Sequence, residues 1–539
     1  MNGFPAYDAG GRDAGAGAGW QALARRSLWA SAAKSLALVV PAVIGLVRFL
    51  TGRDWPVGGV AAACAGAALL IIAGVEAYDV ARLRATRWRL TADRLELRSG
   101  IAVRQRRSIP RDRVRSVDLR ADPVLRVFGL TVVKVGTGEH AAEATELTLD
   151  PLTRHDAEAL RRTLLLGDAT AAPPEDEGDA PLAELRWSWI RYAPLSVWMF
   201  TGTAVALGVA YKALTLIGIQ VFTTEVAEDL WSWVTARPLV TVPLLLVANA
   251  AVGVLGAVLL FAESWGRYRL EREPGRLRLR RGLLTTRSLT LEERRLRGVE
   301  ISEPLLLRLG GGARVKAIAT GLGKAAENET EDVAVLSPPL PLPLARRLAA
   351  QIANPAARTD AAGSAEGHVR TDVEAVAGMG GAGLVAHPAA ARRRRIVRAL
   401  VTVVVLTGVA AVAYGLVPWV WARPWVWAVP GVALPLGLWL AVESAGNLGH
   451  ALGGRHLITR RGAVVRHTVA LDRAGISGWT ISESFFQRRN GLVTVSATTA
   501  AGNGHYDVVD VGRGNGLELA ARAVPDLLEP FLDRQPRPR

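Results

Sequence analysis

Residues 122–130 read DPVLRVFGL, and related stretches follow at 303–311 (EPLLLRLGG) and 483–491 (ESFFQRRNG). We call this motif the cassette: an acid and then a Pro or Ser, an apolar pair and an arginine. A glycine that suits a strand turn precedes each cassette at nearly constant spacing, from Gly100 to Pro123, Gly282 to Pro304 and Gly462 to Ser484. A motif that recurs in the same order along a chain predicts three copies of one unit.

Six apolar stretches are each long enough to cross a bilayer, which takes a helix of about 20 residues. They lie at 28–50, 57–80, 194–222, 239–262, 396–420 and 424–446. Two stretches precede each cassette, so we expect three transmembrane helical hairpins. Of the 539 residues 50% are hydrophobic and the net charge is +16. Basic residues beside long apolar runs are typical of membrane proteins, where they set the orientation.

Arginines gather at the ends of the predicted hairpins rather than in the short loops between paired spans. Examples are Arg25 and Arg26 before the first span, Arg82 and Arg84 after the second, and the run 392–395 before the fifth. The positive-inside rule then places both termini and all long polar segments in the cytoplasm. The abundance of Arg, Ala and Gly is typical of a high-GC bacterial genome, so we expect a multi-pass protein of a bacterial inner membrane.

Each hairpin is followed by alternating apolar and polar residues with turn signals, and then by a short amphipathic helical pattern. The expected fold class is therefore membrane α-helical plus β, with a small β-rich cytoplasmic domain and a C-terminal helix after each hairpin. The predicted domains are 82–166, 264–354 and 447–534, after hairpins at 28–81, 194–263 and 396–446. The remaining segments are tails at 1–27 and 535–539, an acidic Pro-rich linker with an amphipathic lead-in at 167–193, and a flexible linker with a basic end at 355–395.

These residues resemble the bacterial pleckstrin-homology (PH) membrane proteins, and the triple arrangement resembles their YdbT-like members. The resemblance rests mainly on the first copy, at Trp88, Arg89, Leu90, Ile109, Pro110, Val114, Val117, Pro123, Arg126, Phe128, Gly129 and Leu130. It implies a seven-stranded, partly open barrel capped by a helix in each domain, and no particular activity. Some related membrane proteins are associated with resistance to membrane-active peptides, so a role in envelope stress or protection is a hypothesis by resemblance.

The cassette arginines are Arg126, Arg308 and Arg488. One interpretation makes the cassette a structural corner, in which an apolar pair packs inward and the arginine stays at the surface. The alternative is that these arginines face a protein partner or an anionic lipid head group. Basic strand ends near an anionic leaflet would each add about 1 kcal/mol of attraction.

Charges inside the predicted spans form a second candidate set, made of Lys34, Glu76, Lys212, Glu263 and Glu443. A charge in lipid is costly and is a functional hint by default. The glutamates lie near the cytoplasmic ends of the even-numbered spans, which suggests a role common to the three repeats. Pairing between hairpins is one hypothesis, and a transport pathway is the other.

Motifs for catalysis and cofactor binding are absent from the sequence. The single Cys64 excludes a disulfide framework, and no metal-ligand spacing or phosphate-binding loop occurs. We therefore expect a non-enzyme without cofactor or metal, and no nucleic-acid partner. The predicted function is a scaffold or interaction module in contact with the bilayer and with an unknown membrane or cytoplasmic protein. A transporter, an anionic-lipid sensor, an oligomer and contacts between the domains through exposed sheet edges remain open.

Overall fold

The computed structural model describes ten segments of the chain. They are 19–101, 103–114, 116–136, 146–166, 181–196, 198–216, 224–320, 334–354, 383–416 and 423–528. Most of the predicted linkers at 167–193 and 355–395 and the tail at 535–539 therefore lie outside the described residues. Two compact units are present, one mainly Met1–Thr137 with Ala141–Ala172, the other mainly Pro173–Ala210 with Phe222–Arg539.

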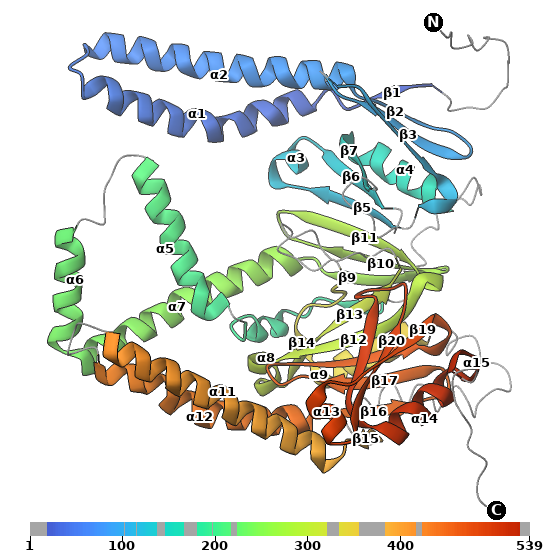
Figure 1. Cartoon of the computed structure of the whole chain (residues 1–539). Helices are drawn as coiled ribbons and strands as arrows, with labels where there is room; N and C mark the ends of the chain where they lie inside the picture. Colours follow the sequence, from blue (N-terminus) through green and yellow to red (C-terminus); the bar gives the residue numbers. More distant parts are fainter. Residues whose placement is uncertain are drawn as a thin grey trace, which may run out of the picture. The chain divides into compact units, whose positions relative to one another are not determined.

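The first unit contains one repeat. Helices α1 (Ser27–Thr51) and α2 (Val57–Ala85) run side by side (Figure 1) and share a small apolar cluster at Leu50, Val60 and Cys64. The strands of this repeat form two rows. One row is a sheet with the order β1 (Gln21–Ala22), β2 (Arg87–Leu90), β3 (Arg94–Ser99) and β4 (Gln105–Pro110). The other is an antiparallel row of β5 (Ser116–Ala121), β6 (Leu130–Gly136) and β7 (Glu146–Thr153). Strands from both rows and helix α4 (Arg154–Leu166) enclose a single hydrophobic core.

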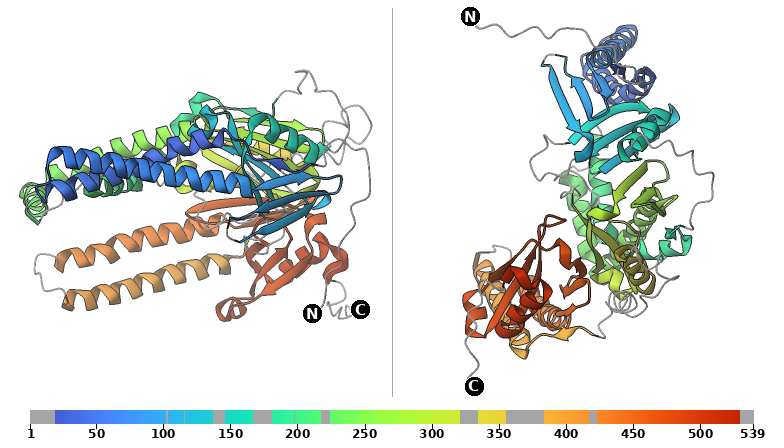
Figure 2. Two further views of the ribbon diagram at one scale, coloured as in Figure 1. Left: turned by 90° about the horizontal axis from the view of Figure 1, so that it is seen from above. Right: turned by 90° about the vertical axis from the view of Figure 1, so that its right-hand side faces the viewer.

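The second unit contains the other two repeats. The second repeat comprises β8 (Ala183–Glu184), α5 (Trp198–Leu216), α6 (Thr224–Ala236), α7 (Pro238–Trp265), β9 (Arg269–Glu273), β10 (Arg276–Arg281), β11 (Thr286–Glu292), β12 (Leu296–Pro304), α8 (Leu305–Leu309), β13 (Gly312–Ala319), β14 (Leu340–Pro341) and α9 (Leu342–Ala353). The third comprises β15 (Val385–Ala386), α11 (Ala389–Leu416), α12 (Arg423–Gly446), β16 (Gly449–Leu452), β17 (His456–Arg461), β18 (Val465–Asp472), β19 (Gly478–Ser482), α13 (Phe485–Arg489), β20 (Leu492–Thr498), β21 (His505–Gly512), α14 (Arg513–Ala523) and α15 (Pro525–Leu528). Figure 2 shows α11 and α12 lying side by side.

The turn glycines fix the register of the repeats. Gly100, Gly282 and Gly462 have φ values of 113°, 104° and 108°, a region that side chains avoid, and a Cβ would lie within 2 Å of a carbonyl oxygen. The short cassette helix α3 (Pro123–Val127) is capped by Asp122, and its equivalents α8 and α13 are preceded by Pro304 and Ser484.

Counting from turn glycine to N-cap (122 − 100, 304 − 282 and 484 − 462) gives 22 residues in every copy. The sequence alignment at Pro123 was therefore wrong by one position, because the proline follows the cap in the first copy and is the cap in the second.

One continuous sheet joins the second and third domains. Its strand order is β14-β13-β12-β18-β17-β16-β15, so β12 of the second domain pairs antiparallel with β18 of the third. Side chains cross the seam as well: Ile458 and Ala470 belong to the core of the second domain, and Ile318 to the core of the third. The two domains therefore form one packed body.

Among the described residues, four helices are long and apolar enough to cross a membrane: α1, α2, α7 and α11. The predicted spans 194–222 and 424–446 contain α5 and α12 but fall partly outside the described residues. Two details differ from the sequence prediction. The connection before the fourth span contains a helix, α6, and the basic end of the linker 355–395 is the first part of α11.

Candidate functional site

The apolar helices of the first repeat are tied to their domain by two ion pairs. Lys34 Nζ on α1 lies 2.5 Å from Asp122 Oδ2, the N-cap carboxylate of the cassette helix. Arg82 in the last turn of α2 lies 3.0 Å from Asp150 Oδ2 on β7. A small cavity of about 130 Å³ lies between these pairs. The predicted intramembrane lysine therefore contacts the domain, and both cations around the cavity are already paired with carboxylates.

In the second repeat the same kind of contact is made by a carboxylate on the helix. Glu263, near the end of α7, accepts hydrogen bonds from the backbone N–H groups of Leu284 (3.0 Å) and Thr285 (2.7 Å). These amides belong to the turn that follows Gly282. Arg281 in the preceding strand stacks over the Trp265 ring at 4.5 Å. The helix end thus holds the β10–β11 turn in place.

Two residues singled out separately in the sequence meet in the structure. Cassette residue Arg308 donates to Glu443 of α12 across 3.1 Å, with the arginine side chain 11% exposed. Glu443 also accepts from Asn447 Nδ2 at 3.2 Å. This contact ties the cassette of the second domain to a helix of the third repeat, so the partner of Glu443 is a domain residue and not a charge of another hairpin.

Glu76 does not share the position of the other two glutamates. The strand register aligns Arg87, Arg269 and Gly449, because each pairs with the residue two before its turn glycine. Glu263 and Glu443 lie six residues before that point, where the first copy has Ala81. The idea of one glutamate common to three repeats was therefore wrong. Glu76 lies earlier in α2, and its Oε1 atom is buried without a hydrogen-bond partner among the described residues.

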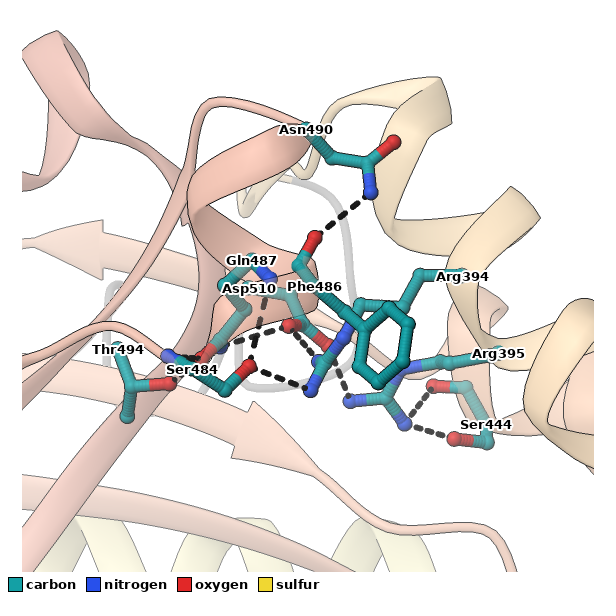
Figure 3. Close-up of polar contacts among 9 residues, drawn as sticks. All are labelled: Arg394, Arg395, Ser444, Ser484, Phe486, Gln487, Asn490, Thr494 and Asp510. Carbon is teal, nitrogen blue, oxygen red and sulfur yellow. Dashed lines mark hydrogen bonds and ion pairs between the residues drawn. The ribbon is translucent and has the colours of Figure 1, made fainter.

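A dense polar cluster lies near the start of α11, and its centre is Asp510 (Figure 3). The Asp510 side chain is 1% exposed and contacts Arg394, Arg395 (3.2 Å) and Gln487 Nε2 (3.0 Å). Gln487 also donates to Thr494 and completes a capping box with Ser484. Arg395 reaches Ser444 of α12 in addition. A single carboxylate thus connects the basic start of an apolar helix to the third domain.

A bulge in the last strand places Asp510. Residues Val493 and Val495 pair with Val511 and Val508, so one extra residue bulges out of β21, and Asp510 takes a positive φ of 61°. The first repeat has its own bulge between the Val133–Leu149 and Thr131–Leu152 pairs, where Asp150 binds Arg82. Asp150 and Asp510 were not among the residues predicted from the sequence. The available signal was an acid near the end of the last strand of these two copies.

The structure places the three remaining predicted residues on the helices α3, α13 and α5. Arg126 is half-buried on α3, Arg488 is exposed on α13, and Lys212 is exposed on α5. The cassette arginines occupy equivalent positions, each four residues after the N-cap, and Arg308 contacts the predicted intramembrane charge Glu443.

A histidine pair lies close to the Asp510 cluster. His387 Nε2 and His450 Nδ1 are 3.0 Å apart. Burial, and secondly the charge of His387, lower the pKa of His450 to about 4, and burial likewise lowers the pKa of His387. Both rings are therefore neutral near pH 7, and one can donate its N–H to the other. The pair stabilises the fold above about pH 6.5, and this contribution is lost as the pH falls toward 4.

The comparison with known families matches the repeat found in the sequence. A family model described as bacterial PH domain matches residues 35–167, 215–356 and 395–529, which together make up more than half of the chain. Each match begins inside an apolar helix and ends just beyond the last helix of its repeat. No curated protein and no solved structure matches the chain.

Proposed function

Because the chain belongs to the bacterial PH-domain family, we propose that it is a membrane-anchored scaffold whose three β-domains present binding surfaces at the cytoplasmic face. Three copies of the domain and four helices that could cross a membrane fit a membrane-associated module. In this proposal the apolar helices form three hairpins in a bacterial inner membrane. Arg82, Arg84 and the run 392–395 lie at the domain ends of their helices, as the positive-inside rule requires.

The observation that carries this proposal is that charged residues near the helix ends and in the cassette form contacts with the domains. Lys34, Arg82, Glu263, Arg308 and Glu443 all contact the domains or each other. Charged groups that are paired in this way hold the domains at fixed positions on their helices. They are poorly suited to moving an ion or solute, which requires groups that bind and release their cargo.

The continuous sheet of the second and third domains adds a second argument. Linked binding surfaces near one membrane raise the effective concentration for a second and third contact, so weak individual contacts can give firm binding. A rigid pair of domains keeps those surfaces at a fixed spacing. Specific partners, and a role in envelope protection, are further parts of this proposal.

The test is affinity purification of the tagged full chain from its own membranes after cross-linking, with bound proteins and lipids both identified. The scaffold proposal predicts a recurrent protein partner. Lys212→Leu should retain it, because that side chain is exposed on an apolar helix and outside the clusters. Phe485→Ser with Phe486→Ser should reduce it if the partner binds the third cassette, where both rings are more than 60% exposed. Recovery of a selected lipid or small solute alone would contradict the scaffold and favour a sensor or transporter.

A further inference from the structure

The seam between β12 and β18 shows how two of these domains join. Seven residue pairs run antiparallel from Gly298–Leu471 to Pro304–Val465. Arg466 binds Glu303 through both carboxylate oxygens, and His467 Nδ1 lies 2.7 Å from Glu300. Gly298 is needed for the close approach, since a Cβ there would lie 2.3 Å from the carbonyl oxygen of Ala470. The seam therefore needs an acidic strand carrying a glycine and a basic strand opposite.

The third domain carries a related strand with one of the two seam glutamates, and in the described part of the chain one edge of this strand has no strand partner. Its β19 and the residue after it read GWTISE from Gly478 to Glu483, against GVEISE from Gly298 to Glu303 in β12. In the described part of the chain, β19 pairs only with β20. Exposure reflects this difference, since Ile301 is 1% exposed and its equivalent Ile481 is 39% exposed. A Cβ on Gly478 would meet nothing within 4 Å, so the chain keeps a glycine where its own fold does not require one.

The first domain carries the basic strand, again at an edge. β4 corresponds to β18 by its distance from the turn glycine, and among the described residues it pairs only with β3. Arg104 lies four residues after Gly100, as Arg466 lies four after Gly462, and it is exposed. The lengths of the two strands also differ. Counted from the turn glycine of its own repeat, β18 begins at Val465, whereas β4 begins two positions later, at Gln105. Pairing with β12 lengthens β18, and the shorter β4 is what we expect of a strand with one unpaired edge.

We propose that β19 of one copy pairs antiparallel with β4 of a second copy of this chain, with Glu483 opposite Arg104. The occupant is a second copy because the chain itself supplies both halves of the seam it already uses internally. Glu483 is now held 3.1 Å from Arg513, whose side chain is 67% exposed, so exchanging that partner for Arg104 costs little. Such a contact joins unlike surfaces, so it generates a ring or an open row of chains along the membrane. It goes beyond the scaffold proposal and needs only that both domains lie on the same side of the membrane.

The register predicts which residues face each other: Ser482 opposite Gln105, as Ser302 is opposite His467. Directly opposed Cα atoms are about 4.5–5.5 Å apart, within reach of a disulfide, whereas diagonal pairs are about 7–8 Å apart.

We would express two differently tagged full chains in one cell, both with Cys64→Ala. One carries Gln105→Cys and the other Ser482→Cys, so that a disulfide can form only between copies. The matched control replaces Ser482→Cys by Thr480→Cys, on the same face but out of register.

The expected result is a two-tag disulfide product that is several-fold more abundant for Ser482→Cys than for Thr480→Cys. Gly478→Val should abolish it, since the side chain would enter the seam while the free strand has room for it. Arg104→Glu should abolish it as well, and Glu483→Arg on the other chain should restore it. Equal products in and out of register, or none, would overturn the inference. So would capture of another protein by Ser482→Cys without the second copy, and neither result would bear on partner recovery by the scaffold.

Discussion

Arg466→Ala is expected to lower the free energy of unfolding of the joined second and third domains by about 3–5 kcal/mol. The reason is the fate of Glu303, whose side chain is 4% exposed and whose two oxygens both accept from the arginine. Without the guanidinium, its charge would stay in the seam with little solvent and without its two hydrogen bonds, and the charge of Arg460 would remain as an electrostatic partner. Thermal or denaturant unfolding of the purified full chain in detergent measures the loss.

The chain offers a control in Glu483, the glutamate of the third cassette that corresponds to Glu303. Arg513→Ala removes the partner of Glu483, but that arginine is 67% exposed, so we expect a loss below about 1 kcal/mol. The exchange Arg466→Glu with Glu303→Arg should recover much of the stability lost in either single variant. Equal effects of Arg466→Ala and Arg513→Ala would mean that the seam is not formed.

Asp510→Asn is the second substitution with a large expected effect, about 3 kcal/mol of lost stability. Asparagine has nearly the same size and tolerates the positive φ of 61°, so the change removes the charge and leaves the backbone preference intact. Arg394 and Arg395 would then face each other at the start of α11 without a carboxylate, and Gln487 would lose its charged acceptor.

The first repeat supplies the comparison for this second change. Asp150→Asn removes the carboxylate that binds Arg82, but both side chains are more than one-third exposed, so we expect a loss of about 1 kcal/mol or less. Unfolding of the two variants under identical conditions is the measurement. A neutral Asp510→Asn would show that the cluster in Figure 3 does not couple the helix to the domain.

The sequence was sufficient for the repeat and for most of the apolar helices. Turn glycines and apolar runs are local signals, because a positive φ or a membrane span constrains consecutive residues. It failed where a role depends on contacts between distant segments. Asp510 meets Arg394 across 116 positions, and only the bulge in β21 turns its carboxylate toward α11.

Residue type alone also led to a wrong grouping of the candidate site residues. Glu76, Glu263 and Glu443 looked equivalent because each lies in an even-numbered span, but pairing of the following strands separates Glu76 from the other two. The cassette arginines are equivalent in position and differ in environment: Arg308 is 11% exposed beside Glu443, whereas Arg488 is exposed. What surrounds each copy decides its role, and the neighbours come from other repeats.

Topology mapping tests the central claim, that all three domains lie on the cytoplasmic side of one membrane. Single cysteines would be placed in a Cys64→Ala chain at Arg162, Arg294 and Glu518, each more than 50% exposed in a different domain, and at Thr51 beside the α1–α2 turn. A membrane-impermeant maleimide applied to intact spheroplasts should label Thr51→Cys at once and the other three only after permeabilisation. Labelling of any one of the three domains from outside would contradict the account.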